Sequence, residues 1–482
     1  MQIYELTLQD LLAKLSKKEI SSPEIVESCL NRINMVDGQV QAFLTVTGDL
    51  AVKQAQDYEK KYADKVLKGI PYALKDDICT NGVRTTSASK MLENFIPQYD
   101  ATVVKLLQEQ GGSLLGKLNM DEMSMGVSSE QSAFHPTCNP WDLKRVAGGS
   151  SGGAAAAVAA DEIPFALGTD ANGAIRQPAS FCGVVGFKPT YGRVSRLGVI
   201  AYASSLEQVG VLSKNVADSA TVMNIIAGKD PYDTTSVDIP VPDYTALDAD
   251  MKGMKIGFPK EFFHKDVDAE VKAAVLAALK QYEARGAIVE EISLPHSEYA
   301  LPAYYIIACA EASTNLAKLD GVQLGLCDTK AENIWDLYSN SRAMGLGDEV
   351  KQRIMFGTYV LSAGQYEKYY LQALKVRRLV HDDFVKVFKD FDLIISPATA
   401  GTAPKLGETP ESALSYINDI LTIPVNMAGL PAISVPCGLI NNLPMGMQII
   451  GKPFAEGTIL KAAYAFEQMN DYYKQKPSLG VY

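Results

Sequence analysis

Residues 147–183 read AGGSSGGAAAAVAADEIPFALGTDANGAIRQPASFCG, and this stretch decides the fold that the sequence predicts. It opens with Gly148–Gly153, where two serine hydroxyls lie between pairs of glycines. Glycine tolerates positive φ and lets a ligand approach the main chain, so such a loop exposes backbone amides and hydroxyls. We expect an alanine-rich helix over Gly153–Ala160, a buried strand at Phe165–Leu167 and a second glycine-bearing turn at Gly168–Gly173.

Outward from this stretch, helical and strand-like patterns alternate along the chain. Thr7 precedes an apolar period that predicts a helix through Leu15, and Ser21 and Glu24 form a capping box at the start of a second helix. The same patterns predict helices at 49–66, 102–110 and 271–285, and strands at 69–75, 113–115, 254–258, 287–292, 391–395, 431–436 and 445–450.

This alternation predicts an α/β fold with a large mixed β-sheet covered by helices on both sides. We expect residues 1–482 to form a single domain, in which about the first 65 residues are a helical part packed on the body. The stretch 228–253 contains several Asp and Pro residues and could be a surface loop or a linker. We favour the loop.

Composition narrows the function classes. The net charge of −11 and the absence of any Lys/Arg run longer than two residues argue against nucleic-acid binding by this chain alone. Seven scattered cysteines without a CxxC pair indicate reduced thiols, and the four histidines show no spacing typical of a metal site. No apolar stretch approaches 18 residues, and the first residues lack the apolar core of a signal peptide. We therefore expect a cytoplasmic protein with no membrane segment and no metal site.

Three short motifs have competing interpretations. Gly111–Lys117 spells GxxxxGK, but Leu118 stands where a P-loop needs Ser or Thr, so we interpret it as the end of a helix followed by a strand. Gly148–Gly152 fits the GxSxG nucleophile elbow, which would also need an acid and a histidine in productive geometry. Ser87–Lys90 fits SxxK without its SDN and KTG partners, so we attribute it to chance.

The opening stretch resembles the amidase signature family over a long and specific pattern. Members of that family carry GGSSGG and, 24 residues after its first serine, the nucleophilic serine of a turn written DTGGSIR or similar. Here that first serine is Ser150, and the matching position is Ala174, in the turn Asp170–Arg176. The resemblance therefore implies the amidase signature fold with the frame of its site present, but without the oxygen atom that attacks the substrate.

Lys75 matches the base of the family's Ser–Ser–Lys triad. A Lys at the end of an apolar strand can be partly desolvated, which favours its neutral form, although a Lys beside Asp76 and Asp77 is more often ion-paired. In the family the base lies in an A-[IL]-K-D-N-I context, and this chain has the same pattern with Asp77 in place of the Asn. That change adds a negative charge that favours the protonated Lys if the two side chains approach.

The resemblance also implies a mechanism. A neutral Lys75 would take a proton through the bridging Ser150, whose backbone in the family has an unusual cis peptide bond, while a second serine attacks the amide. Backbone N–H groups of the turn Ala171, Asn172 and Gly173 would stabilise the oxyanion. Asn172 stands where the family has Gly; since Asn is the other residue best suited to left-handed backbone, we expect the turn to survive.

Within the family, the chain is most similar to the A-type subunits of glutamyl-tRNA(Gln) amidotransferases. The resemblance implies that Arg353 and Asp419 hold the carboxylate and the amine of free glutamine, with Tyr304 or Tyr305 completing that pocket. Each could equally be an ordinary ion pair or a packed aromatic. The segments that carry this resemblance are 117–126, 138–146, 181–210, 304–313, 347–364 and 418–438.

Such an A-type subunit supplies ammonia from glutamine to other chains. The resemblance implies a heterotrimer with a larger B-type partner, which binds the tRNA and uses ATP with Mg²⁺, and a small C-type partner. This chain would hold no cofactor of its own and would meet tRNA only through its partner.

The sequence therefore predicts an A-type amidotransferase subunit whose own glutaminase step is lost or severely impaired, because loss of a catalytic Ser costs on the order of 10⁶ in kcat in subtilisin. A first alternative is a non-catalytic scaffold or amide-ligand binding protein. A second is an active amidase with a surrogate nucleophile, for which Ser151, Thr169 and Cys182 are the nearby candidates. Because Ala171, Asn172 and Asp77 also depart from the family pattern, we favour natural divergence as the origin of Ala174.

Overall fold

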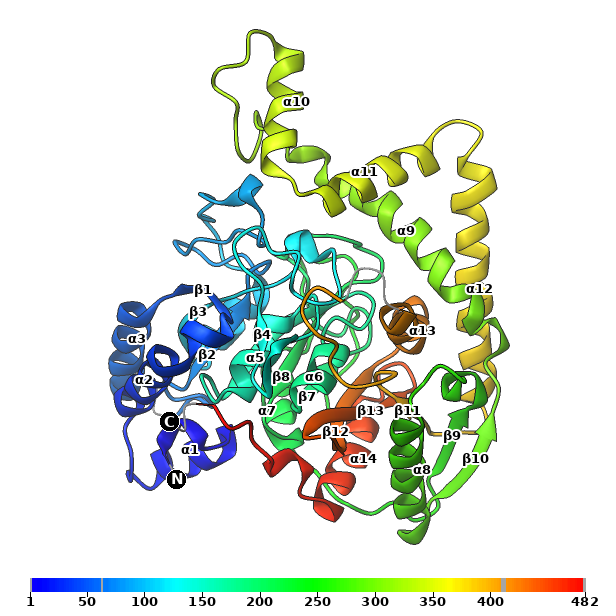
Figure 1. Cartoon of the computed structure of the whole chain (residues 1–482). Coiled ribbons are helices and arrows are strands. Elements are labelled where there is room, and N and C mark those ends of the chain that lie inside the picture. Colours follow the sequence, from blue (N-terminus) through cyan, green and yellow to red (C-terminus); the bar gives the residue numbers. More distant parts are fainter. Residues whose placement is uncertain (1, 62–63, 409–412, 480–482) are drawn as a thin grey trace.

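The computed structural model describes residues 2–61, 64–408 and 413–479. Within these residues, eleven strands form one mixed sheet at the centre of the molecule (Figure 1). In spatial order the strands are β1 (Phe43–Val46), β3 (Ser113–Leu118), β2 (Pro71–Lys75), β6 (Phe165–Asp170), β8 (Gln208–Ser213), β7 (Val185–Lys188), β12 (Ala432–Ile440), β13 (Leu443–Gly451), β11 (Leu393–Pro397), β9 (Lys255–Pro259) and β10 (Ile288–Ile292). A separate two-stranded hairpin consists of β4 (Cys138–Asn139) and β5 (Asp142–Val146).

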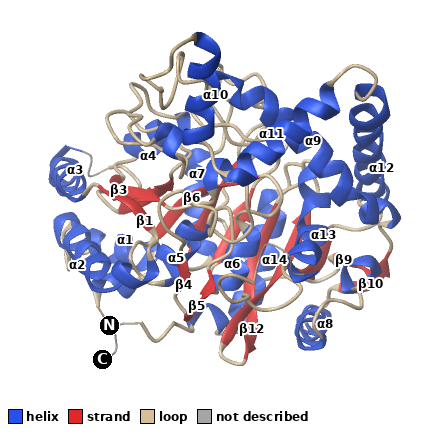
Figure 2. Cartoon of the chain, turned by 45° about the horizontal axis from the view of Figure 1, so that its top comes forward, coloured by secondary structure: helices blue, strands red, loops and turns tan. Residues whose placement is uncertain are grey.

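Helices surround the sheet in both views (Figures 1 and 2). They are α1 (Leu8–Ser16), α2 (Ser22–Val40), α3 (Gly48–Lys61), α4 (Thr102–Glu109), α5 (Gly152–Ala159), α6 (Arg176–Cys182), α7 (Val216–Ile226), α8 (Ala269–Ala284), α9 (Ala300–Asn315), α10 (Ile334–Gly345), α11 (Asp348–Leu361), α12 (Leu371–Val387), α13 (Ala413–Met427) and α14 (Glu456–Met469). The predicted mixed α/β architecture is confirmed. Among the described residues, no helix is both long and apolar enough to cross a bilayer.

Around β2 and β6, the two sides of the sheet carry different hydrophobic clusters, because successive side chains of a strand point to opposite faces. Along β2, Tyr72 and Leu74 belong to a large cluster that also holds residues of α1, α4, α7 and α14. Ala73, between them, belongs to a second cluster with residues of α2, α3, α5 and α6. β6 alternates in the same way, with Phe165 in the first cluster and Ala166 in the second. The apolar strands thus bury both faces, which is why the sheet has helices on both sides.

Three parallel strands end at one edge of the sheet. β2 runs parallel to both β3 and β6, with Ala73 opposite Ala166 and Leu74 opposite Leu167. Because the carboxyl ends of parallel strands meet at the same edge, Lys75, which ends β2, comes next to the last residues of β6. Polar residues that follow apolar strands in this region are therefore gathered at one place.

Several elements differ from the expected boundaries. The helical N-terminal part contains a strand, β1, which pairs antiparallel with β3 at one end of the sheet. The strand expected at Phe165–Leu167 runs to Asp170, because residues 165–170 all pair with β8. The predicted helix 49–66 begins at Gly48 and is described to Lys61; residues 62 and 63 lie outside the described part.

The GxxxxGK motif has the structural interpretation that we favoured. α4 ends at Glu109, and β3 follows from Ser113 to Leu118. Lys117 is fully buried and its Nζ lies 3.2 Å from Asp76 Oδ1, so it is the partner of a buried carboxylate. The stretch 228–253 is a loop without helix or strand, and its Asp230 accepts hydrogen bonds from Thr102 and Ser195.

The crossing of α9 and α11 depends on one glycine. A Cβ on Gly357 of α11 would overlap the carbonyl oxygen of Cys309 in α9, and that backbone atom cannot move aside. We expect Gly357→Ala to lower the free energy of unfolding by about 1–3 kcal/mol or more, the range of overpacked positions. Urea denaturation measures the change. Gly38→Ala in α2, where nothing lies within 4 Å of the new Cβ, is the matched control and should leave stability unchanged or slightly raised.

Candidate active site

Lys75 is the centre of a buried polar cluster at the strand edge. Its Nζ lies 2.8 Å from Ser150 Oγ, 2.7 Å from Thr169 Oγ1 and 3.1 Å from Ser124 Oγ. The carboxylate of Asp77 is 3.4 Å away and fully buried. The structure therefore brings together the Lys and the first serine that the sequence predicted, and adds a carboxylate and two hydroxyls around the same nitrogen.

Ser150 is held in a tight loop that leads into α5. The peptide bond between Gly149 and Ser150 is cis, as the resemblance implied, and Gly148 has a φ of +89°. The Gly149 N–H donates to Gln177 Oε1 at 2.9 Å and the Gly152 N–H donates to Ser129 Oγ at 3.1 Å. The glycines of this loop are thus needed for close backbone contacts, and they fix the position of the serine between them.

Residue 174 is the position at which the sequence predicts the third member of the triad. The Ser151 N–H donates to the carbonyl oxygen of Ala174 at 3.1 Å, which places the second turn directly beside the Ser150 loop. The side chain of Ala174 is 3% exposed. A buried methyl group therefore occupies the position that the resemblance in sequence matches to a nucleophilic serine.

A buried ion pair shapes this turn. Asp170 accepts hydrogen bonds from the N–H groups of Gly173, at 2.7 Å, and Ile175, at 3.1 Å. Arg176 Nε lies 3.1 Å from Asp170 Oδ2, and Asn426 also donates to Asp170. Burial acts to raise the pKa of Asp170, but Arg176, Lys188 and the hydrogen bond from Asn426 together outweigh it and hold that pKa below its ordinary value. The Gly173 N–H, one of the three amides expected to stabilise an oxyanion, is therefore already bound to Asp170.

The expectation of a left-handed Asn172 is wrong. The residue of this turn with positive φ is Gly173, at +115°, and Asn172 is not among the residues with positive φ. The carbonyl of Asn172 instead accepts a hydrogen bond from Thr422 Oγ1, and a Cβ on Gly173 would clash with that same threonine. The turn therefore survives the loss of a glycine because the neighbouring glycine, not Asn172, takes the left-handed conformation.

The surrogate nucleophiles considered from the sequence all have other contacts. Ser151 Oγ donates to the carbonyl of Thr169 at 2.9 Å, and Thr169 Oγ1 donates to Asp77 Oδ2 at 2.7 Å. Cys182 Sγ lies 3.3 Å from the carbonyl of Ala147, and burial raises the pKa of its thiol far above the ordinary value. Neither hydroxyl is free, and the thiol is held as a weak nucleophile.

The residues expected to bind a ligand also come together. The guanidinium of Arg353 lies 5.3 Å from the ring centre of Tyr305, whose OH donates to Asp419 Oδ2 at 3.4 Å. Arg353 Nη1 donates to Tyr202 OH at 2.8 Å, and Arg353 Nε pairs with Glu349 at 2.7 Å. Tyr305 thus completes the Arg353–Asp419 cluster.

Tyr304 packs against the ring of Tyr305. It is fully buried and contacts the Tyr305 ring edge-on at 5.4 Å. Of the two tyrosines, Tyr305 is therefore the one whose hydroxyl contacts Asp419.

Asp419 is a buried acid beside this cation. Burial raises the pKa of its carboxyl to about 7, while Arg353 and the Tyr305 hydroxyl act to lower it. It therefore changes charge close to neutral pH. A cationic ligand would favour the ionised form.

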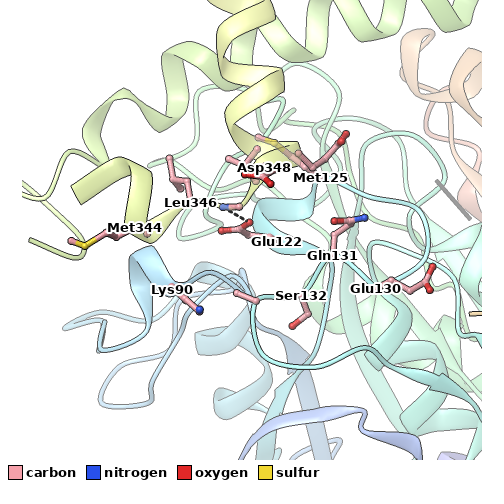
Figure 3. A pocket seen from close by; sticks show the side chains of 14 residues that line it. Lys90, Glu122, Met125, Glu130, Gln131, Ser132, Met344, Leu346 and Asp348 are labelled. Atoms are coloured by element: carbon pink, nitrogen blue, oxygen red, sulfur yellow. Dashed lines mark hydrogen bonds between the residues drawn. The ribbon is translucent and has the colours of Figure 1, made fainter. Parts of the chain in front are cut away.

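A pocket of about 280 Å³ opens beside this cluster, between the loop after β3 and the junction of α10 with α11 (Figure 3). Glu122 lies at its wall, where its carboxylate accepts the Gly347 N–H at 2.9 Å. Glu349, the partner of Arg353, lines the same pocket. The pocket thus adjoins the residues that hold Arg353.

Sequence patterns did not indicate Ser124 or Tyr202 as parts of the site. Ser124 reaches Lys75 from the short turn Glu122–Ser124 with left-handed backbone, at a φ of +61°, and no motif marks it. Tyr202 lies within the segment 181–210, far from Arg353 in sequence. A parallel pairing of β2 with β3 and β6, had it been inferred, would have pointed to the residues that follow each strand.

The chain is similar to known proteins over nearly its whole length. The family described as Amidase matches residues 24–460. The A-type subunit of glutamyl-tRNA(Gln) amidotransferase of Syntrophomonas wolfei subsp. wolfei is 59% identical over 482 residues, covering 100% of this chain and 99% of that protein. The crystal structure of the corresponding A-type subunit from Thermotoga maritima has a TM-score of 0.83 at 43% identity and covers 99% of both chains. A bacterial aryl acylamidase structure has a TM-score of 0.87 at 27% identity over 98% of each chain.

Proposed function

The chain belongs to the amidase signature family, and we propose that it is the A-type subunit of a tRNA-dependent amidotransferase whose own glutaminase step is lost. The observation that carries the proposal is Ala174, at the end of an otherwise assembled Lys75–Ser150 relay. Full-length similarity to the A-type subunits of glutamyl-tRNA(Gln) amidotransferases supports the place of this chain in such an enzyme.

The chemistry of the relay explains why residue 174 is decisive. In a complete site, a serine oxygen at this position would attack the amide carbonyl and pass its proton to Ser150, whose own proton would go to a neutral Lys75. The proton taken up by Lys75 would then return through Ser150 to the amide nitrogen, so that the carbon–nitrogen bond breaks and ammonia leaves. Water would hydrolyse the remaining glutamyl ester to glutamate. A methyl group has no lone pair with which to begin this step.

The retained ligand cluster supports glutamine as the bound molecule. A free amino acid carries a carboxylate, which suits Arg353, and an ammonium group, which suits an ionised Asp419. Both lie in the same buried cluster with Tyr305. The same observation favours the second candidate function, an amide-ligand binding protein that recognises glutamine without hydrolysing it.

We further propose that partner chains perform the remaining chemistry in the cytoplasm. A B-type partner would bind the tRNA and use ATP with Mg²⁺, and a small C-type partner would complete the heterotrimer. This chain would hold no cofactor. The net charge of −11 supports the assignment of RNA binding to a partner.

Co-expression with a B-type and a C-type partner chain tests whether the protein belongs to such a heterotrimer. Recovery of a stable complex that converts Glu-tRNA(Gln) with free ammonium, but not with glutamine, would support the proposal. A protein that binds glutamine yet never forms the complex would favour the amide-binding alternative. If the protein neither binds glutamine nor forms the complex, the proposal is wrong.

Glutamine binding should depend on pH through Asp419. Because burial raises the pKa of this carboxyl to about 7, it is neutral in more acidic solution and offers no charge to the ligand's ammonium. We expect affinity to rise as pH increases through about 7 and to fall up to about tenfold for each pH unit below it. Isothermal titration calorimetry from about pH 5.5 to about pH 8 measures this, and Asp419→Asn should bind weakly at every pH. A flat profile in the unmodified protein would contradict the role of Asp419.

A further inference from the structure

The contacts of Lys75 also determine its state of charge. Asp77 Oδ2 accepts hydrogen bonds from Thr169 Oγ1 at 2.7 Å and from Ser124 Oγ at 3.1 Å. An ionised carboxylate can only accept, and each hydroxyl has a single proton. Both hydroxyl protons therefore point to Asp77, and both hydroxyl oxygens must accept from Lys75. Two of the lysine's hydrogens are fixed in this way.

The third direction from the nitrogen of Lys75 points to Ser150, at 2.8 Å. If Lys75 is neutral, a lone pair lies there and the lysine can take the proton of Ser150. If Lys75 is an ammonium, an N–H lies there and the lysine cannot act as a base. The difference between a working relay and a blocked one is thus a single proton on this nitrogen.

Charge decides between the two forms. Asp77 is fully buried, and its second oxygen, Oδ1, has no hydrogen-bond partner within the described residues. A neutral Lys75 would leave this carboxylate as an unpaired buried charge, which is strongly unfavourable. Lys117, the other buried lysine nearby, is already paired with Asp76 at 3.2 Å. The compensating cation for Asp77 is therefore Lys75.

Two further acids face the pair from other elements. Asp121, after β3, and Glu207, before β8, both interact with Lys75. Burial raises the pKa of Asp121 to about 6 and that of Glu207 to about 7. Because both are carboxylic acids, neither can balance the negative charge of Asp77. Any negative charge that they carry further favours the ammonium form of Lys75.

We propose that Asp77 is a second block on the site: it holds Lys75 as an ammonium, so restoring a hydroxyl at residue 174 does not by itself restore amide hydrolysis. Asp77 acts through Lys75 and is a positioning residue that sets the charge of the base. This inference rests on the proposed function, since it concerns the same relay. The relay requires both Ala174→Ser and Asp77→Asn, because only the second change frees the lone pair that receives the proton of Ser150.

The test compares Ala174→Ser with the double variant Ala174→Ser/Asp77→Asn. Glutamate release from glutamine is measured from about pH 6 to about pH 10, a range that approaches the ordinary pKa of lysine. General base catalysis contributes about 10²–10⁴-fold, so we expect kcat of the double variant near neutral pH to exceed that of Ala174→Ser by at least about tenfold. KM should stay unchanged, and the rise of rate with pH should move to lower pH. Equal rates and equal pH profiles in the two proteins would overturn the proposal.

Glu207→Gln in the Ala174→Ser background is the matched control. It removes another buried carboxyl, which accepts a hydrogen bond from the Tyr202 N–H rather than from Lys75. It should leave the rate within about twofold, since no hydrogen bond or ion pair joins Glu207 to Lys75 within the described residues, whereas Asp77 lies 3.4 Å from Lys75 Nζ. A gain equal to that of Asp77→Asn would mean that any nearby carboxyl has the same effect, and the specific role of Asp77 would fail.

A spectroscopic measurement decides the question even if every variant proves inactive or Asp77→Asn fails to fold. Nitrogen-detected NMR of ¹⁵N-lysine-labelled protein, with Lys75→Met for assignment, reports whether the nitrogen is an ammonium or an amine. We expect an ammonium near neutral pH in the unmodified protein; an amine would overturn the proposal. An ammonium combined with an inactive double variant that does not bind glutamine would instead show that the substrate in the proposed function is wrong.

Discussion

Purified protein incubated with glutamine is expected to release no glutamate above the uncatalysed background and to form no glutamyl ester. The reason is the absence of an oxygen in the side chain of residue 174, the buried Ala174, whose backbone is hydrogen-bonded to the loop that holds Ser150. Removal of a catalytic serine costs on the order of 10⁶ in kcat in subtilisin, and a retained oxyanion turn does not offset that loss. The other nearby groups, Ser151, Thr169 and Cys182, are hydrogen-bonded or desolvated.

A coupled assay measures glutamate release, and intact-protein mass spectrometry detects any glutamyl ester. The double variant Ala174→Ser/Asp77→Asn serves as the positive control, because it has both an attacking oxygen and a lysine free of its carboxylate. Turnover by the unmodified protein near the enzyme median of about 10 s⁻¹ would contradict the prediction and reveal a different nucleophile. A glutamyl adduct trapped on Ser151 or Thr169 would identify it.

The sequence predicted the fold well because its signals are local. The capping box at Ser21, the helix end before Gly111 and the apolar strands each depend on neighbouring residues, and the structure has those elements. The pairing of strands depends on distant residues, so the position of β1 beside β3 was not predicted. The turn at Asn172 shows the same limit, since Thr422, 250 residues away, contacts it from α13.

The candidate site also has residues that local motifs predicted and residues that depend on distant parts of the chain. Lys75 and Ser150 were identified from short motifs, and the structure places them 2.8 Å apart. The surroundings of Lys75 come from three strands, so Ser124 and the hydrogen bond from Thr169 to Asp77 follow only from the sheet order. Residues two apart face the same side of a sheet only while the strand continues. Once the strand has ended, a carboxylate two residues after a lysine can point in either direction. β2 ends at Lys75, and the chain turns there.

Asp170→Asn is expected to give the largest loss of stability among these substitutions. Asp170 and Arg176 are both fully buried, and the same carboxylate holds the amides of Gly173 and Ile175. Removing one partner of a buried ion pair typically lowers the free energy of unfolding by about 3–5 kcal/mol, because the other charge remains buried without compensation. Arg176 would then keep only its bonds to neutral acceptors, such as Gln448.

Urea denaturation of Asp170→Asn, Arg176→Met and the double variant measures the interaction energy between the two side chains. Because each single change leaves an unpaired group, we expect the double variant to lose less than the sum of the two single losses. Arg378→Ala is the control, since its pair with Asp382 is largely exposed and should leave the denaturation midpoint close to that of the unmodified protein. Additive losses in the double variant would mean that the two side chains stabilise the turn independently.

The pH dependence of the free energy of unfolding is a separate test of the Asp170–Arg176 pair. The pKa of Asp170 is lower in the folded protein than in the unfolded chain, where it is about 3.9. The unfolded state therefore binds the proton first, so the stabilisation from Asp170 is fully present above about pH 5 and is lost as pH falls toward the folded pKa. Asn at this position does not titrate. The stability difference between the unmodified protein and Asp170→Asn should consequently narrow below about pH 4, and a constant difference from about pH 7 to about pH 3 would show that the charge of Asp170 is not what stabilises the turn.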